Sequence, residues 1–169
     1  MSVSLEPITR DETILIADLA DEIWHDYYKD FISAEQINYM LGKFYSDHAL
    51  HAQIDEGQIF FKIIDNGSVI GFVSYSRKGK TEYFIHKLYV QTLYHGQKIG
   101  SSVIKILCDR MRRECDDADI QVRLTVNRQN FKAINFYFRN GFIIERAADF
   151  DIGDGFFMND FVMLLTLKN

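Results

Sequence analysis

The stretch that decides the fold is residues 83–102, YFIHKLYVQTLYHGQKIGSS. Its first eight residues are rich in aromatic and apolar side chains, which predicts a strand that ends at Val90. A loop containing Gly96 follows, and a helical pattern begins at Gly100. A strand, a glycine-containing loop and a helix N-terminus form an anion site, because backbone N–H groups and the helix dipole converge there. The stretch therefore predicts a phosphate-binding loop.

The spacing of this loop disfavours the common nucleotide-binding loops. The loop His95–Ser102 has no Gly-Lys-Ser/Thr sequence of the P-loop type, and it does not contain the Gly-x-Gly-x-x-Gly pattern of dinucleotide-binding folds. The phosphate group that we expect at the loop therefore belongs to neither a nucleoside triphosphate nor a dinucleotide.

A second informative stretch lies downstream, at residues 124–142, LTVNRQNFKAINFYFRNGF. It reads as the end of a strand, an asparagine, and a helix that carries Ala133 and Tyr137 and stops before Gly141-Phe142. This pattern predicts a strand at Ile120–Val126 and a helix at Asn130–Asn140.

The rest of the chain has similar local signals. Thr9 with Glu12, and Ser33 with Gln36, are capping boxes that open helices. Asp65-Asn66-Gly67 predicts a tight hairpin turn. The further expected elements are strands at Val3–Ile8, Ile59–Ile64, Ser68–Ser76, Glu82–Val90, Ile143–Ile152 and Phe156–Leu167, and helices at Asp11–Trp24, from Ser33 onward, at Ser46–Asp55 and at Gly100–Cys115.

This order predicts an α/β (α+β) fold with a central sheet and helices on both faces. The 169 residues include 47% apolar side chains and contain no repeat or linker, so we expect a single domain over residues 1–169. The formal charge of −5 disfavours nucleic-acid binding. No apolar run is long enough for a membrane span, and the N-terminus lacks a signal-peptide pattern, which predicts a cytoplasmic protein. Cys108 and Cys115 are expected to be free thiols.

Together, the two stretches resemble the GNAT superfamily of acetyl-CoA-dependent N-acetyltransferases. The family's loop reads Gln/Arg-x-x-Gly-x-Gly/Ala, and His95 to Gly100 occupy it here, with His95 in place of Gln/Arg and Lys98 in place of the first glycine. The stretch from Asn127 to Phe142 matches the family's second pattern in every diagnostic place. The resemblance covers essentially the whole chain and implies a mixed, mostly antiparallel sheet.

The resemblance also implies where acetyl-CoA binds. In the family, two strands diverge and the pantetheine arm of CoA lies between them, while the loop holds the pyrophosphate. The residues that this assigns to the cofactor are Leu88, Tyr89, Val90, His95, Gly96, Gln97, Lys98, Ile99, Gly100, Ser101, Asn127, Asn130, Ala133, Phe136 and Tyr137. No metal is expected. His48 and His51 are one helical turn apart but have no third ligand at a recognisable spacing.

Two side chains are the candidates for catalysis. Tyr137 would donate a proton to the departing thiolate of CoA, because an unperturbed phenol has a pKa of about 10; the alternative is a helix residue packed on the sheet. His86 interrupts an apolar strand face, where the family often has a glutamate that takes the proton of the amine. Imidazole suits that task, and the alternative is a core histidine. Glu82 is a weaker candidate for the base.

The acceptor is expected to be a small-molecule amine. The connector Trp24–Phe31 and the final hairpin, Phe150–Phe161, lie where the family builds its acceptor pocket, and aromatic rings with aspartates suit an amine cation. The residues assigned to the acceptor are Trp24, Tyr27, Tyr28 and Phe150. The hairpin loosely resembles that of bacterial polyamine-type acetyltransferases, so a diamine or polyamine is the first hypothesis. A protein lysine or N-terminus, an amino sugar, an inactive CoA-binding sensor and a homodimer stay open.

Overall fold

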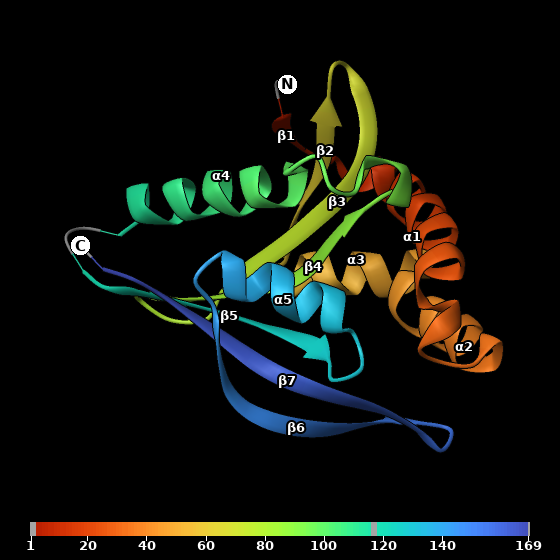
Figure 1. Cartoon of the computed structure of the whole chain (residues 1–169). Helices are drawn as coiled ribbons and strands as arrows, with labels where there is room; N and C mark the ends of the chain where they lie inside the picture. The colour runs from red at the N-terminus through yellow and green to blue at the C-terminus, as the bar shows by residue number, and fades with distance from the viewer. Residues whose placement is uncertain (1–2, 116–117, 169) are drawn as a thin grey trace. The chain divides into compact units, whose positions relative to one another are not determined.

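The computed structural model describes residues 3–115 and 118–168. Within these ranges it contains five α-helices and seven strands, and the strands hydrogen-bond in the order β1-β2-β3-β4-β5-β7-β6 (Figure 1). The expected mixed α/β fold with a mostly antiparallel sheet is confirmed. The chain divides into two compact units, Met1–Ser76 with Lys87–Ile106 and Arg77–His86 with Leu107–Asn169. The boundary crosses β4 (Glu82–Val90) and α4 (Ile99–Arg113).

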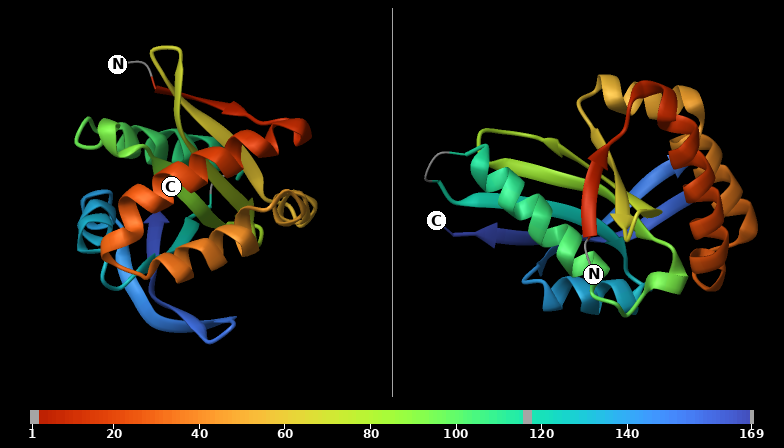
Figure 2. Two further views of the ribbon diagram at one scale, coloured as in Figure 1. Left: turned by 90° about the vertical axis from the view of Figure 1, so that its right-hand side faces the viewer. Right: turned by 90° about the horizontal axis from the view of Figure 1, so that it is seen from above.

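The first unit begins with a strand and a run of helices. Its elements are β1 (Val3–Pro7), α1 (Thr13–Tyr27), α2 (Ala34–Tyr45), α3 (Asp47–Asp55), β2 (Ile59–Asp65) and β3 (Ser68–Arg77), of which Arg77 falls in the second unit. Helices α1 and α2 lie side by side (Figures 1 and 2).

Side-chain caps determine where the helices of the first unit begin. The Ser33 hydroxyl accepts a hydrogen bond from the Gln36 N–H at 3.1 Å, and the Ser46 hydroxyl accepts one from Ala49 N–H at 3.3 Å. The predicted capping contact from the Thr9 N–H to Glu12 is present at 2.7 Å, but it opens a single 3₁₀ turn before α1 begins at Thr13. Helix α1 then continues to Tyr27, three residues beyond the expected end.

The hairpin of β2 and β3 forms as predicted. The two strands are antiparallel, and the turn residues Asn66 and Gly67 have φ values of 49° and 83°. Positive φ at both central residues matches the right-handed twist of the flanking strands. Strand β1 pairs antiparallel with β2 on its other side, with Val3 opposite Asp65.

Gly71 marks a close approach between the backbones of β3 and β4. A Cβ atom at this position would lie 2.1 Å from the carbonyl oxygen of Tyr89 and 2.9 Å from the Cα of Val90. Next to it, the Gln91 N–H donates to the carbonyl of Ile70 at 2.9 Å. Only glycine fits here, because the obstructing atoms belong to the main chain and cannot rotate away.

The second unit is built around the C-terminal strands. Its elements, besides the parts of β4 and α4, are β5 (Ile120–Asn127), α5 (Phe131–Arg139), β6 (Ile143–Gly153) and β7 (Phe156–Leu167). Strand β5 runs parallel to β4, with Phe84 opposite Arg123, and antiparallel to β7, with Asn127 opposite Asp160. Helix α4 ends at Arg113, two residues before the expected end, and both cysteines are free thiols.

The two faces of this sheet differ in character. On one face Val122, Leu124 and Val126 of β5 are buried. On the other, which we call the polar face, Arg123, Thr125 and Asn127 are half-buried. This alternation is the two-residue period of a strand.

A forked ion pair spans the polar face from β5 to the edge strand β6. The Nε of Arg123 donates to Oε2 of Glu145 at 3.0 Å and the Nη2 donates to Oε1 at 2.8 Å, where the register of β6 against β7 shifts. A bidentate pair of this kind adds geometric specificity to the attraction, and here it links two strands that both pair with β7.

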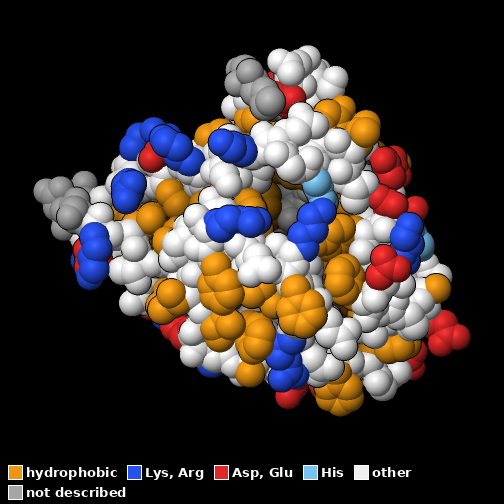
Figure 3. All heavy atoms as spheres, in the orientation of Figure 1, with side chains coloured by type: hydrophobic (Ala, Val, Ile, Leu, Met, Phe, Trp, Pro, Cys, Tyr) orange, Lys and Arg blue, Asp and Glu red, His pale blue; other side chains and the backbone are white. Residues whose placement is uncertain are grey.

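Hydrophobic side chains reach the surface over α5 (Figure 3). The exposed ones of this helix are Phe131, at 69% exposure, and Phe138, at 45%. The other apolar side chains of α5 are half-buried, except that of Ile134, which is buried.

We expect Gly71→Ala to destabilise the protein by about 3 kcal/mol, because the added methyl group collides with main-chain atoms of β4. Urea denaturation followed by circular dichroism measures this. The matched control is Gly42→Ala in α2, where a Cβ atom has no neighbour within 4 Å; it should stabilise by about 0.5–1 kcal/mol through helix propensity. Equal unfolding midpoints for the two variants would contradict the assignment of Gly71.

Candidate functional site

The predicted phosphate loop follows β4 in the first unit. A 3₁₀ turn at Thr92–Tyr94 comes first, and the imidazole Nε2 of His95 then lies 2.8 Å from the carbonyl oxygen of Val90. This contact brings the loop back onto the end of the strand that precedes it. Gly96 has φ 81°, and Lys98 has φ 61°. Lys98 thus adopts the left-handed conformation that glycine adopts most readily. The family that the sequence resembles has glycine at this position.

Helix α4 begins directly after this loop, at Ile99. The first N–H groups of a helix have no carbonyl partner within it, and the dipole makes that end positive. The Lys98 side chain is exposed beside them and carries a full positive charge. Backbone donors, dipole and ammonium group together suit a pyrophosphate. The predicted residues His95–Ser101 are therefore gathered in one segment whose conformation fits that group.

An aromatic cluster joins the predicted acceptor residues to β4 within the first unit. The ring of Trp24 lies 4.7 Å from that of Tyr28 and 5.8 Å from that of Tyr89, between ring centroids. The ring of Tyr27 lies 5.8 Å from the imidazole of His95. Three of the residues assigned to the acceptor thus contact two of those assigned to the cofactor.

Two polar contacts attach α1 to the same loop. The Thr92 hydroxyl donates to the carboxylate of Asp26, which lowers the pKa of that carboxyl, and the Gln91 side chain donates to Glu22 at 2.9 Å. The aromatic cluster therefore has an acidic border, which suits a cationic acceptor.

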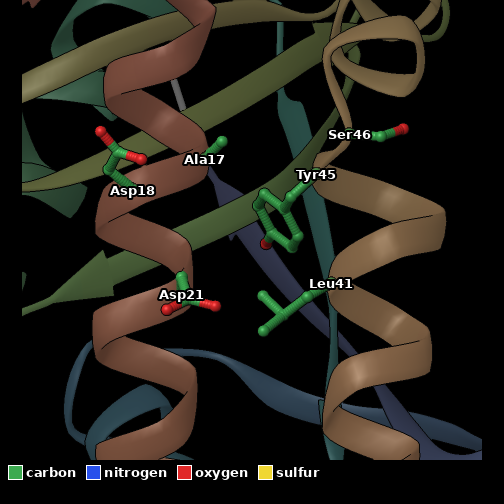
Figure 4. A pocket seen from close by; sticks show the side chains of 6 residues that line it. All are labelled: Ala17, Asp18, Asp21, Leu41, Tyr45 and Ser46. Atoms are coloured by element: carbon green, nitrogen blue, oxygen red, sulfur yellow. The ribbon is translucent and has the colours of Figure 1, made fainter.

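A groove lies between α1 and α2. Leu41 and Tyr45 project from α2 toward α1, and Asp18 and Asp21 lie on α1 (Figure 4). The lining residues are Ala17, Asp18, Asp21, Leu41, Tyr45 and Ser46, and they include none of the predicted acceptor residues.

The second predicted motif lies in the second unit, at the end of β5 and in α5. The Asn130 side chain is 2% exposed and accepts the N–H of Ala133 at 3.2 Å. It is thus the N-cap of α5, a structural role that its position before the helix could have revealed. The side chain of Asn127 accepts the N–H of Gln129 at 2.9 Å. Ala133 and Phe136 lie half-buried on α5.

Tyr137 is held from both sides. Its ring packs against Phe136 at 5.1 Å and Phe142 at 5.5 Å, and its carbonyl oxygen accepts the N–H groups of Asn140 and Phe142 at 3.0 and 3.1 Å. The ring is half-buried. Its orientation is therefore determined by the end of α5, as a proton donor of fixed position requires.

His86 lies in the part of β4 that belongs to the second unit. Its ring contacts Phe84 at 4.9 Å, and both side chains are half-buried. Since Phe84 is opposite Arg123, both lie on the polar face. Phe150 of β6, the fourth predicted acceptor residue, comes two positions after Ala148, which is opposite Asp160 on that same face. The structure thus places His86 and Phe150 on one face of the sheet.

A buried lysine, Lys87, follows His86 and had no assigned function. It is 8% exposed, and its Nζ donates to Gln53 at 2.5 Å and Gln58 at 3.4 Å. The ammonium also lies 5.4 Å from the ring centroid of Tyr45. Burial lowers the pKa of Lys87 to about 7. Alternation along β4 could have revealed it, because Tyr83 and Ile85 share its parity and are buried.

The described ranges contain neither a group of three metal-binding side chains nor a helix long and apolar enough to cross a membrane. His51 is used within the fold. Its Nε2 lies 3.1 Å from the carbonyl oxygen of Arg10 and 3.6 Å from the carboxylate of Asp47.

Comparisons with known proteins agree with this geometry. Residues 16–142 match the family described as "Acetyltransferase (GNAT) family". The chain is 26% identical over 154 residues to a spermidine N(1)-acetyltransferase of Thermoplasma acidophilum, covering 86% of this chain and 91% of the relative.

Two solved structures share the fold. One is a PaiA N-acetyltransferase from Thermoplasma acidophilum in complex with coenzyme A, with TM-score 0.78, 23% identity and coverage of 99% of this chain and 100% of that one. The other is a GCN5-related N-acetyltransferase from Rhodopseudomonas palustris, with TM-score 0.79, 18% identity and coverage of 99% and 97%.

We expect stability to rise with pH through the titration of Lys87. Its pKa is about 7 when folded and about 10.5 when unfolded, so between these values the unfolded chain binds more protons and folding gains up to about 5 kcal/mol with rising pH. Lys87→Met lacks this group. The difference in unfolding free energy between wild type and variant, measured in urea from pH 6 to pH 10, should therefore move in favour of the wild type. A difference that is constant across this range would contradict the assignment.

Proposed function

Because the chain belongs to the acetyltransferase (GNAT) family, it is an N-acetyltransferase, and we propose that it transfers the acetyl group of acetyl-CoA to a primary amine of a small diamine or polyamine. The observation that carries the cofactor is the loop before α4, where Gly96 and Lys98 both have positive φ. The acceptor class is supported by the relative named spermidine N(1)-acetyltransferase and by the acidic, aromatic surroundings of Trp24 and Tyr28.

The cofactor is held by main-chain groups and one ammonium group. The loop His95–Ser101 and the first turn of α4 supply N–H donors to the pyrophosphate, and Lys98 adds a positive charge. Leu88 and Val90 supply main-chain contacts to the acyl end. An N–H of this strand that donates to the thioester oxygen stabilises the negative charge that develops when the amine attacks.

The reaction is a direct transfer. The nitrogen lone pair attacks the thioester carbonyl carbon, a carbon–nitrogen bond forms and the carbon–sulfur bond breaks. His86 takes the proton that the amine loses, and the hydroxyl of Tyr137 gives a proton to the departing thiolate. Both side chains have positions determined by neighbouring rings, Phe84 for His86 and Phe142 for Tyr137.

A thiol-release assay with acetyl-CoA tests the function. Polyamines, amino acids, amino sugars and lysine peptides serve as acceptors, and CoA binding is followed by calorimetry. We expect release that depends on an acceptor and is fastest with diamines or polyamines, because the acidic border of the aromatic cluster attracts polycations. Fastest release with a peptide or an amino sugar would overturn the acceptor class. Binding of CoA without release for any acceptor would favour a sensor.

The control for this assay is Tyr137→Phe. It removes the hydroxyl and keeps the ring that packs against Phe136 and Phe142. The variant should bind CoA as the wild type does and turn over about 100-fold more slowly, the typical contribution of a general acid. Unchanged turnover would remove the proton donor from Tyr137.

His86→Ala should lower kcat/KM by about 100-fold and change its pH dependence. An imidazole accepts a proton only when neutral, so the wild-type rate should fall toward acidic pH. The variant should lose this acidic limb, which a pH–rate profile with saturating acetyl-CoA measures. An acidic limb that persists unchanged in the variant would assign the base to another group.

A further inference from the structure

Asp160 lies on the polar face of the second unit, outside the residues assigned so far. It is opposite Asn127 of β5 and Ala148 of β6. Directly opposed residues of antiparallel strands project to the same face, and residues two apart in one strand do so as well. Asp160 therefore shares its face with Thr125, His86 and Phe150.

The carboxyl group of Asp160 is buried but incompletely neutralised. The side chain is 6% exposed, and the hydroxyl of Thr125 donates a hydrogen bond to it. A carboxylate can accept about four hydrogen bonds, and among the described residues the hydroxyl of Thr125 is the hydrogen-bond donor that acts on its pKa. The nearby charges are those of Arg128 and Asp149, which form an ion pair with each other. The three groups together retain one net negative charge when Asp160 is ionised.

Burial of a charged carboxylate without a full countercharge is unfavourable. The pKa of Asp160 reflects this cost. Burial raises the pKa of Asp160 to about 6, while Thr125 and Arg128 act in the opposite direction. Above that pH the group is an anion with little water around it. The attraction between a cation and this carboxylate would be screened less by solvent than the attraction between a cation and an exposed aspartate.

The separation of Asp160 from His86 follows from the strand register. Phe84 of β4 pairs with Arg123 of β5, and Arg123 pairs with Leu164 of β7, so β5 separates the strand of His86 from the strand of Asp160. Two strand spacings place the Cα atoms of His86 and Asp160 at least about 10 Å apart. A single nitrogen cannot contact both side chains across that distance.

A diamine spans this distance. Nitrogens separated by three or four methylene groups lie about 5 to 6 Å apart, from bonds of about 1.5 Å. A charge-assisted hydrogen bond at each end adds about 2.8 Å, so the total of about 11 Å is enough to reach across the one intervening strand. Phe150, diagonal to Asp160 on the same face, offers a ring to the bound cation.

We propose that Asp160 binds the second, non-reacting ammonium group of a diamine or polyamine while the first amino group loses its proton to His86. Asp160 is thus a specificity-determining residue that distinguishes diamines from monoamines. The inference rests on the proposed function, in which His86 is the base.

The test compares butane-1,4-diamine with butylamine, at pH 8 where Asp160 is ionised. The wild type should have a higher kcat/KM for the diamine. Asp160→Asn keeps the size of the side chain and an acceptor for the Thr125 hydroxyl, but removes the charge. It should lower kcat/KM for the diamine at least about tenfold, mainly through KM, and leave that for butylamine within about twofold.

Two further variants separate specificity from structure. Asp109→Asn removes the same charge from α4, where the guanidinium of Arg112 lies 4.0 Å from the Asp109 carboxylate, and should leave the diamine preference unchanged. Asp160→Glu retains the charge on a longer side chain and should retain the preference, shifted toward propane-1,3-diamine; this variant decides the matter if Asp160→Asn does not fold. Equal losses for diamine and monoamine, or a preference that survives in Asp160→Asn, would overturn the inference.

Direct binding distinguishes failure of this inference from failure of the proposed function. Calorimetry measures the Kd of butane-1,4-diamine for wild type and Asp160→Asn with CoA present. A wild type that acetylates no amine overturns the proposed function, yet diamine binding that weakens at least about tenfold in the variant still supports Asp160 as the ammonium site. Acetylation with equal diamine affinities for the two proteins overturns the role of Asp160 and leaves the proposed function standing.

Discussion

The contact of two main chains at Gly71 is the constraint on which the cofactor loop depends. Because β3 approaches the end of β4 closely enough to exclude a methyl group, the segment from Tyr89 to Gln91 has one position, confirmed by the hydrogen bond from the Gln91 N–H to Ile70. The imidazole of His95 then returns to the carbonyl of Val90. The start of the phosphate loop is therefore determined by backbone packing, and side chains refine it.

The alternation of β4 distributes its polar residues between two environments. Tyr83, Ile85 and Lys87 share one parity and are buried, whereas Phe84 and His86 share the other and lie on the polar face. The period of two that places His86 on the polar face therefore buries its neighbour Lys87, whose ammonium group lies near two glutamine side chains and two aromatic rings.

Local signals in the sequence were sufficient for most element boundaries and for the order of strand, loop and helix at residues 83–102. The bounds of β4 were predicted to the residue, and Ser33 and Ser46 cap their helices because short-range hydrogen bonds specify such positions. The end of α1 was missed by three residues, since no glycine or proline marks it. Asp160 could not be recognised from the sequence, because its meaning depends on the register of β5, β6 and β7, which long-range pairing determines.

In the loop before α4, one residue has a backbone conformation that glycine favours, but the residue itself is a lysine. Lys98 holds φ 61°, which costs a residue with a Cβ atom about 1 to 2 kcal/mol relative to the right-handed region, and stability alone would favour glycine there. A lysine nevertheless occupies the position, directly before the first residue of α4, and its side chain is exposed. The strain is offset if an anion binds, because a pyrophosphate then receives a full charge in addition to main-chain N–H groups. Under the proposed function, the departure from the family's glycine adds electrostatic attraction for the pyrophosphate of CoA.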